Sequence, residues 1–175
     1  MLNFDFHNPT HIVFGQGRIA DLAKLVPAAA KVLILVGGAS AEKTGTLAEV
    51  RAALGERQHA TFSGIEPNPS YETSMKAVAQ IREGGFDFLL AVGGGSVIDA
   101  TKFIAAAVRF EGADPWAILE KHGRNIQGAM PFGSVLTLPA TGSEMNNGGV
   151  ITHRAKGAKL SFGSVHTYPV FSVLD

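Results

Sequence analysis

Three consecutive glycines and a serine, Gly93-Gly94-Gly95-Ser96, separate an apolar run, Phe86–Val92, from a segment with helical spacing, Val97–Val108. Glycine lets the main chain adopt positive φ and come close to a ligand, and the first turn of a helix has backbone N–H groups without a partner. Because the helix dipole also favours negative charge at that end, this loop is predicted to bind an anion. The alternative is a plain turn in which Ser96 only caps the following helix.

Two further loops carry hydrogen-bonding groups. Asn68 lies between Pro67 and Pro69, which restrict its backbone, and its amide can face a sugar or a base. Further along, the hydroxyl groups of Thr137, Thr141 and Ser143 surround a flexible glycine, a pattern that suits sugar and phosphate oxygens. The alternatives are an ordinary proline turn and an ordinary polar turn. The G-x-G-x-x-G and Walker motifs are both missing from the sequence, which disfavours the common dinucleotide fingerprint and a P-loop hydrolase.

Alternating strands and helices must position these loops. Apolar runs predict strands at Phe4–Phe6, His11–Phe14, Lys31–Val36, His59–Phe62, Phe86–Val92, Val135–Leu138, Gly149–His153 and Val170–Leu174. Helical spacing predicts helices between Gly17 and Pro27, and around Leu47–Leu54, Met75–Ile81 and Val97–Val108. This alternation predicts an α/β fold, a mostly parallel sheet with helices on both faces. Ligands of such sheets lie beyond the carboxyl ends of the strands, where the glycine loop is expected.

The composition fits one globular domain and argues against several classes of function. A chain of 175 residues, 46% of them hydrophobic, suits a single core. Zero net charge, with 17% charged residues, argues against a nucleic acid partner. The lack of cysteine removes disulfides and thiolate chemistry and is typical of a reducing compartment. Neither a signal peptide nor an apolar run of about 18 residues occurs, so we expect a cytoplasmic protein without membrane contact.

Three stretches together resemble the iron-containing (group III) alcohol dehydrogenases. Gly93–Asp99 followed by Lys102 is similar to the diphosphate loop and helix of that family. Glu66–Pro69 is similar to its Pro-Asn-Pro loop, and Leu138–Glu144 to its Thr-Gly-Ser-Glu loop. The stretches occur in the family's order, and the similarity extends from Phe4 to Asp175. The resemblance implies that residues 1–175 form a Rossmann-like (dehydroquinate synthase-like) nucleotide-binding domain.

The sequence also resembles one branch of this family, the NADP-dependent butanol dehydrogenases and aldehyde reductases. The resemblance lies in Asn3–Gly15, Thr101–Ala106 and Asp114-Pro115-Trp116. It implies NADP(H) as the cofactor and small aldehydes and primary alcohols as substrates. Residue types and resemblance together predict cofactor contacts at Gly37, Gly38, Ser40, Asn68, Gly94, Gly95, Ser96, Asp99, Thr137, Leu138, Thr141, Ser143 and Lys159.

The loop after Lys31–Val36 bears on the choice between NAD and NADP. NAD-binding proteins commonly place a carboxylate there for the adenosine 2′-hydroxyl, but this loop reads Gly37-Gly38-Ala39-Ser40. Nothing in it repels a 2′-phosphate, and Lys43 follows closely, so the loop favours NADP. The resemblance places Lys159 at the nicotinamide ribose. Asp99 lies a short way into the helix after the glycine loop, where its carboxylate is expected to order the nicotinamide side of the pocket. The alternative for Asp99 is a first-turn acid favoured by the helix dipole.

Metal binding is expected outside this chain. In the family, a helical second domain supplies an aspartate and three histidines to one divalent iron or zinc ion, which polarises the substrate oxygen. The resemblance puts these ligands beyond Asp175, so we expect no catalytic and no metal-binding residue here, and no turnover by the chain alone. His59, His122, His153 and His166 are interpreted as isolated surface or loop residues. Members of the family form homodimers, which we expect here as well.

Two other interpretations remain open from the sequence. The first is an enzyme of the same fold that acts on polyols or phosphorylated sugars, because the Pro-Asn-Pro and Thr-Gly-Ser-Glu loops also fit such enzymes. The second is a non-catalytic nucleotide-binding or dimerisation module that is complete at 175 residues. Aspartate and histidine codons on predicted helices downstream of Asp175 would remove the second interpretation.

Overall fold

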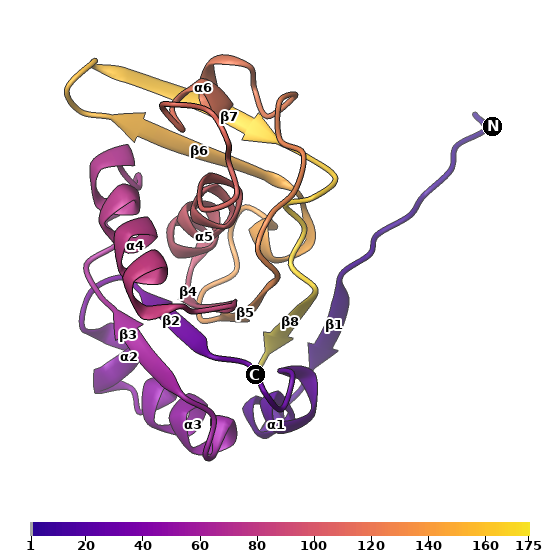
Figure 1. The fold of residues 1–175 in the computed structure, drawn as a ribbon. Coiled ribbons are helices and arrows are strands. Elements are labelled where there is room, and N and C mark those ends of the chain that lie inside the picture. The colour runs from indigo at the N-terminus through magenta and orange to yellow at the C-terminus, as the bar shows by residue number, and fades with distance from the viewer. Residues whose placement is uncertain (1) are drawn as a thin grey trace.

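A six-stranded parallel sheet forms the centre of the protein in a computed structural model, which describes residues 2–175 (Figure 1). Its strands are β1 (His11–Phe14), β2 (Val32–Val36), β3 (His59–Phe62), β4 (Phe88–Gly93), β5 (Phe132–Leu136) and β8 (Phe171–Leu174). They are ordered β1-β8-β5-β4-β2-β3 across the sheet, and all neighbouring pairs are parallel. The predicted α/β fold with a mostly parallel sheet is therefore confirmed.

Helices cover both faces of the sheet because its central strands are apolar on both sides. In β2, Ile34 belongs to one buried cluster while its neighbours Leu33 and Leu35 belong to the other, as the alternation of side chains along a strand requires. The helices of the Ile34 face are η1 (Arg18–Asp21), α1 (Leu22–Leu25), α2 (Ser40–Lys43) and α3 (Thr46–Leu54). Those of the opposite face are α4 (Tyr71–Gly84), α5 (Gly95–Ala107) and α6 (Ala117–Glu120).

The strand order reverses between β2 and β4. After β2 the chain continues to β3 at one edge of the sheet, and it then returns through α4 to β4 on the other side of β2. The chain segments that follow β2 and β4 therefore go to opposite faces of the sheet. A crevice forms between these segments at the carboxyl ends of the two strands. Gly37-Gly38 follows β2 and Gly94-Gly95 follows β4, so both glycine pairs border this crevice.

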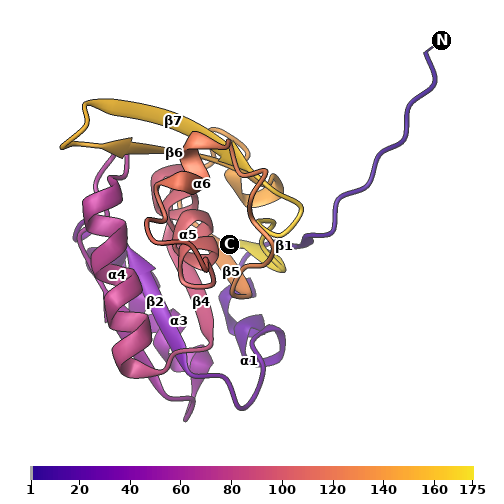
Figure 2. The same ribbon diagram turned by 45° about the horizontal axis from the view of Figure 1, so that its top comes forward.

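An antiparallel hairpin lies outside the main sheet, against the helices of one face (Figure 2). It pairs β6 (Gly148–His153) with β7 (Ala158–Gly163). β6 packs on α5 and α4, and β7 packs on α6. Alternate residues of β6 are buried, and the last of these is His153, which is only 8% exposed. The interpretation of His153 as a surface or loop residue is wrong, and the sequence analysis missed β7.

Three predicted elements differ from the structure. Phe4–Phe6 is not a strand, since residues 2–10 have no regular secondary structure and both rings are exposed. The strand predicted at Val135–Leu138 is β5, which begins and ends earlier, at Phe132 and Leu136. Gly133 within it leaves room for the ring of Phe171, which lies 2.2 Å from where a Cβ would be. The predicted helix before Pro27 is divided into the 3-10 turn η1 and the single turn α1.

Candidate functional site

A cavity of about 510 Å³ occupies the crevice between β2 and β4. Its walls come from the loops after β2, β4 and β5, the loop before α4, and the hairpin. The lining residues are Gly37, Gly38, Ile65, Pro67, Asn68, Pro69, Gly94, Gly95, Ser96, Val97, Asp99, Leu138, Ala140, Thr141, Val150 and Lys159. Every residue predicted to contact a cofactor is among them except Ser40, Thr137 and Ser143.

The three glycines of the loop are needed for different reasons. A Cβ on Gly93 would lie 2.6 Å from Cγ2 of Val97, and a Cβ on Gly95 would lie 2.9 Å from Oγ1 of Thr141. A Cβ on Gly94 would meet nothing closer than the carbonyl oxygen of Leu138 at 3.8 Å. None of the three has positive φ, which corrects the expectation from the sequence. These glycines provide close approach and open space, and the backbone conformation does not require them.

Helix α5 begins beside the cavity. Gly94 is its N-cap residue, no side chain caps the helix, and the N–H groups of Val97 and Ile98 donate to Gly94 O. The N–H groups of Gly95 and Ser96 have no carbonyl one turn earlier within the helix. They and the helix dipole favour an anion at this point. The alternative that Ser96 caps the helix is wrong, because α5 already starts at Gly95.

Asn68 and Lys159 join two walls of the cavity. Lys159 Nζ on β7 donates a hydrogen bond to Asn68 Oδ1, at 2.9 Å. Asn68 has φ of 54°, in the left-handed region that asparagine enters more readily than most residues. Both residues are exposed, so their amide and ammonium groups remain accessible to hydroxyl or phosphate oxygens of a ligand.

Asp99 connects α5 to the segments that follow β5. Its Oδ1 accepts a hydrogen bond from Ser143 Oγ at 2.6 Å, and its Oδ2 accepts one from the N–H of Val150 at 3.1 Å. Burial raises the pKa of the Asp99 carboxyl, although the Ser143 hydroxyl and the charge of Lys102 oppose this rise. Asp99 thus holds the loop and the hairpin in place, a role beyond that of a first-turn acid.

Lys102 is fully buried beneath the cavity. Its Nζ donates to Ser143 Oγ at 3.0 Å, Asn146 Oδ1 at 2.7 Å and the carbonyl oxygen of Gly148 at 2.8 Å. Sequence reasoning quoted Lys102 in the family motif but gave it no role. A signal was present, because a lysine three residues after Asp99 in an otherwise apolar helix needs buried partners.

Three predicted contact residues lie away from the cavity wall. Ser40 is the exposed first residue of α2. Thr137 is exposed and its N–H donates to the carbonyl oxygen of Gly93 at 3.0 Å. Ser143 is 2% exposed and bonds to Asp99 and Lys102. Six further lining residues were not predicted as cofactor contacts: Ile65, Pro67, Pro69, Val97, Ala140 and Val150.

Residues 2–175, which the structure describes, contain neither a cluster of metal ligands nor a membrane-spanning helix. Within them, no three or more His, Cys, Asp or Glu side chains are placed to hold a metal ion. None of the helices in this range has the length and apolar character needed to cross a bilayer.

A parallel sheet with a glycine-rich cavity at the place where its strand order reverses is typical of the class of nucleotide-binding α/β folds. The family model for iron-containing alcohol dehydrogenases matches residues 9–175. The chain is 55% identical over 176 residues to the NADPH-dependent aldehyde reductase YqhD of Escherichia coli (strain K12), covering 100% of this chain and 46% of that protein. It is 46% identical over 178 residues to the probable NADH-dependent butanol dehydrogenase 2 of Bacillus subtilis (strain 168), covering 100% of this chain and 45% of that protein.

Solved structures agree with these matches. The crystal structure of E. coli K-12 YqhD has a TM-score of 0.96 at 55% identity, over 99% of this chain and 45% of that one. The NADH-dependent butanol dehydrogenase A of Thermotoga maritima has a TM-score of 0.92 at 38% identity, over 99% and 44%. The chain belongs to the iron-containing alcohol dehydrogenase family. It spans about half the length of the curated relatives it matches.

Proposed function

We propose that residues 1–175 form the NADP(H)-binding domain of a metal-dependent aldehyde reductase or alcohol dehydrogenase. The observation that carries this proposal is the open side of Gly94, which lies on the cavity wall at the N-terminus of α5. A diphosphate at this point meets the N–H groups of Gly95 and Ser96 without a side chain in its way. The similarity to an NADPH-dependent aldehyde reductase supports the same assignment.

The residues of this chain bind and orient the dinucleotide. When bound, the cofactor supplies a hydride to an aldehyde or takes one from an alcohol. Gly38 leaves the side after β2 open for the adenosine, while Gly37 lets the loop pass close to the carbonyl oxygen of Ile65. Asn68 and Lys159 present donors to ribose hydroxyls. The fixed position of Asp99 keeps the wall behind them in one place.

We propose a preference for NADP(H) over NAD(H). The loop Gly37–Ser40 has no carboxylate to repel a 2′-phosphate, and Glu42 on α2 is paired with Arg51 at 3.4 Å. Ser40 and Lys43, the first and last residues of α2, are the donors proposed for the 2′-phosphate. The named relatives include both NADPH- and NADH-dependent proteins, so the preference depends on this loop and not on the family as a whole.

Titration of the purified chain with NADPH and with NADH tests the assignment. Because one charge-assisted hydrogen bond contributes about 1.5–3 kcal/mol, we expect NADPH to bind about tenfold tighter than NADH, or more. Equal affinities would contradict the preference for NADPH. If neither nucleotide binds, the whole assignment is wrong.

A pair of glycine variants locates the site in the same assay. Gly94→Val puts methyl groups into the open space and should weaken NADPH binding at least about tenfold, since it blocks close approach of the diphosphate. Gly128→Val is the matched control, because a Cβ there is likewise unobstructed, with nothing within 4 Å, but the residue lies outside this cavity. Equal effects of the two substitutions would contradict the proposed diphosphate position.

The substrates proposed for the whole protein are small aldehydes and primary alcohols, as the names of the relatives support. Those names give less support to polyols or phosphorylated sugars, and to a non-catalytic module. A divalent iron or zinc ion would polarise the substrate oxygen in the remaining half of such a protein. The chain alone is therefore proposed to bind nucleotide without turning over substrate.

We also propose that the protein is a cytoplasmic homodimer. Leu2, Phe4 and Phe6 expose their apolar side chains, and they lead into β1 at the edge of the sheet, which supports pairing with a second copy. A chain of 175 residues without cysteine is compatible with a reducing compartment. The balanced charge gives no support to a nucleic acid partner.

A further inference from the structure

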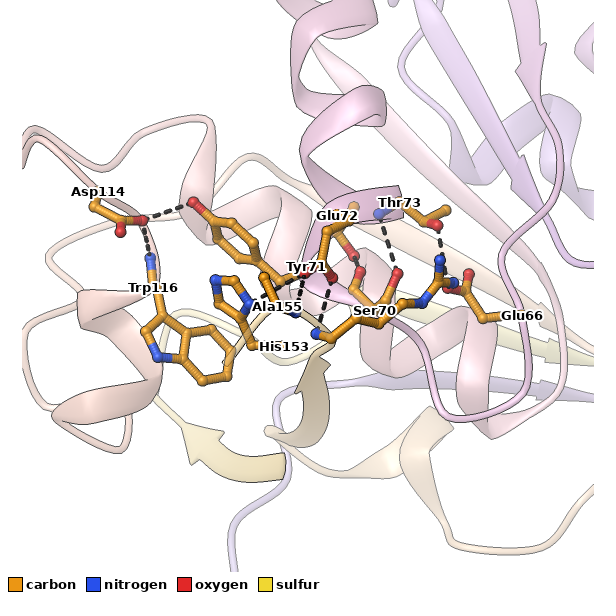
Figure 3. Close-up of polar contacts among 11 residues, drawn as sticks. Glu66, Ser70, Tyr71, Glu72, Thr73, Asp114, Trp116, His153 and Ala155 are labelled. Carbon is orange, nitrogen blue, oxygen red and sulfur yellow. Dashed lines mark hydrogen bonds and ion pairs between the residues drawn. The ribbon is translucent and has the colours of Figure 1, made fainter. Parts of the chain in front are cut away.

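A buried histidine closes the end of the hairpin (Figure 3). His153, the last residue of β6, stacks on Tyr71 with the ring centroids 4.6 Å apart and the planes at 14°. Its ring meets Trp116 edge-on, with centroids 4.8 Å apart and planes at 89°. Figure 3 shows the imidazole close to both aromatic rings, which come from α4 and from the loop before α6.

Asp114 fixes the two aromatic partners relative to each other. Its Oδ1 accepts hydrogen bonds from the Tyr71 hydroxyl at 2.6 Å and from the N–H of Trp116 at 2.9 Å. Burial, together with the bond to Asp114, raises the pKa of the Tyr71 hydroxyl, so this group remains a donor. The site for the imidazole is thus held by contacts that do not involve the hairpin.

Glu72 faces the imidazole from α4. Its Oε1 lies 3.1 Å from His153 Nδ1, yet this buried nitrogen makes no hydrogen bond of normal geometry. The same carboxylate accepts the N–H groups of Arg154 at 3.2 Å and Ala155 at 3.0 Å, at the turn of the hairpin. Burial alone would raise the pKa of Glu72, but these N–H groups and the charge of His153 lower it overall. Glu72 therefore stays ionised and attracts an imidazolium.

This cluster is directly connected to the cavity wall. Thr152, which precedes His153, lies opposite Lys159 in the hairpin, and its N–H donates to the carbonyl oxygen of Pro69 at 3.0 Å. Pro69 follows Asn68, whose side chain accepts the hydrogen bond from Lys159. The position of the hairpin end on α4 therefore determines where Asn68 and Lys159 lie.

We propose that His153 is a proton-dependent positioning residue for the cofactor cleft. As an imidazolium it draws the hairpin end onto Glu72 and holds Lys159 and Asn68 in the arrangement that receives the dinucleotide. The proposal rests on the function proposed above. His153 itself does not line the cavity, so it acts through the hairpin.

Protonation changes the balance of charge at this point. It gives the 3.1 Å contact between His153 Nδ1 and Glu72 Oε1 opposite charges, whereas the neutral ring has no charge to attract the carboxylate. The other charged groups on the elements around the ring are Asp114, on the loop before α6, and Arg154 and Lys156, on the turn of the hairpin. Arg154 is paired with Glu66 and Lys156 acts on Asp114, so Glu72 is the carboxylate that faces the imidazole at close range.

Binding of NADP⁺, which is stable in acid, tests the proposal between pH 5.5 and 8.5. The purified 175-residue chain is compared with His153→Phe, which keeps an aromatic ring in the stack, and with His166→Phe, a change at an exposed loop. The ratio of the His153→Phe dissociation constant to that of the unmodified chain should rise about two- to fivefold as the pH falls, the factor expected of a partly exposed ion pair. His166→Phe should show a constant ratio, because other titrating groups act equally in all three proteins.

A second variant and a spectroscopic signal separate structure from protonation. Glu72→Gln keeps an acceptor for the hairpin N–H groups but removes the charge, so it should flatten the same pH dependence. Trp116 is the only tryptophan. An adjacent imidazolium quenches indole fluorescence, so its emission should fall on acidification in the unmodified chain and not in His153→Phe.

The possible outcomes distinguish the two proposals. If no protein binds NADP⁺ at any pH, the proposed function fails, and this inference fails with it. If NADP⁺ binds but the His153→Phe ratio stays constant with pH, the function stands and the role of His153 is overturned. A fluorescence change that persists in His153→Phe would also overturn it.

Discussion

Lys102 shows how one buried charge supports the candidate site. Its three hydrogen bonds all go to the segment from Ser143 to Gly148, which leads into β6. Burial lowers the pKa of Lys102 to about 8, although Asp99 and Glu144 oppose this shift. The charged form of Lys102 therefore lowers the stability of the folded chain, although the same side chain positions the start of the hairpin.

This pKa predicts a distinct pH dependence of stability. Between about pH 8 and the ordinary lysine value of 10.5, the unfolded chain holds more protons on Lys102 than the folded chain. The free energy of unfolding should therefore rise with pH in this window, by at most about 1.4 kcal/mol per pH unit. Lys102→Met should lack this rise, which urea denaturation of both proteins from pH 7.5 to 9.5 can measure. Parallel pH profiles of the two proteins would show that Lys102 keeps an ordinary pKa.

Most of the candidate site could be predicted residue by residue, but the separate roles of similar residues could not. The apolar run before the glycines and the helix after them indicate a phosphate loop, because this depends on neighbours in sequence. Which glycine opens to the cavity depends on Thr141, a residue far along the chain that packs against Gly95. Ser143 is predicted to contact the cofactor, but it does not line the cavity and instead bonds to Asp99 and Lys102.

At the scale of elements, the hairpin depends on a close backbone contact with the loop after α6. Gly123 has φ of 85°, and a Cβ on it would lie 2.3 Å from the carbonyl oxygen of Gly163 on β7. The N–H of Gly163 also donates to the carbonyl oxygen of His122 at 3.3 Å. The loop and β7 can therefore approach this closely only when residue 123 has no side chain.

Two glycine substitutions separate this contact from backbone strain. Gly123→Ala should lower the free energy of unfolding through both positive φ and the clash with β7. Gly157→Ala has a similar positive φ of 61°, but a Cβ there meets nothing within 4 Å. We expect Gly123→Ala to cost about 1–3 kcal/mol more than Gly157→Ala in urea denaturation, the range known for overpacking. Equal losses would mean that the loop can move away from β7 at little cost.

The strands that could be predicted from the sequence are those in which consecutive residues are all buried. β2 and β4 are buried on both faces, so they read as continuous apolar runs and were placed within two residues. β7 has the sequence AKLSFG, in which only Phe162 is buried, so its composition gives a weak strand signal. Its partner is β6 alone, a tertiary relation that no local pattern contains.

At the scale of the whole molecule, the sheet order creates the cavity. Residues after β2, β4 and β5 meet at one end because these strands are parallel neighbours, although they are far apart in the chain. The fold class and this end of the sheet could be predicted from the alternation of strands and helices. The hairpin that completes the wall could not, because its position depends on packing against α4, α5 and α6.

The N-terminal arm is the part of the molecule that its own fold leaves uncovered. Figure 1 shows it running away from the body of the protein. Leu2, Phe4 and Phe6 are 90%, 84% and 79% exposed, and they alternate with polar residues as the side chains of a strand would. The arm continues into β1, an edge strand whose outer backbone groups have no partner strand among residues 2–175. Apolar alternation and an open edge together favour strand pairing with a second copy.

Deletion of residues 2–7 should therefore convert a dimer into a monomer, as measured by light scattering after size-exclusion chromatography. Replacing Leu2, Phe4 and Phe6 together by serine should weaken the dimer less, because the backbone can still form strand hydrogen bonds. Val165→Ser is the control, since this valine is 78% exposed but lies far from the arm in sequence, after β7. A monomeric unmodified chain, or a deletion variant that remains dimeric, would exclude the arm as the interface.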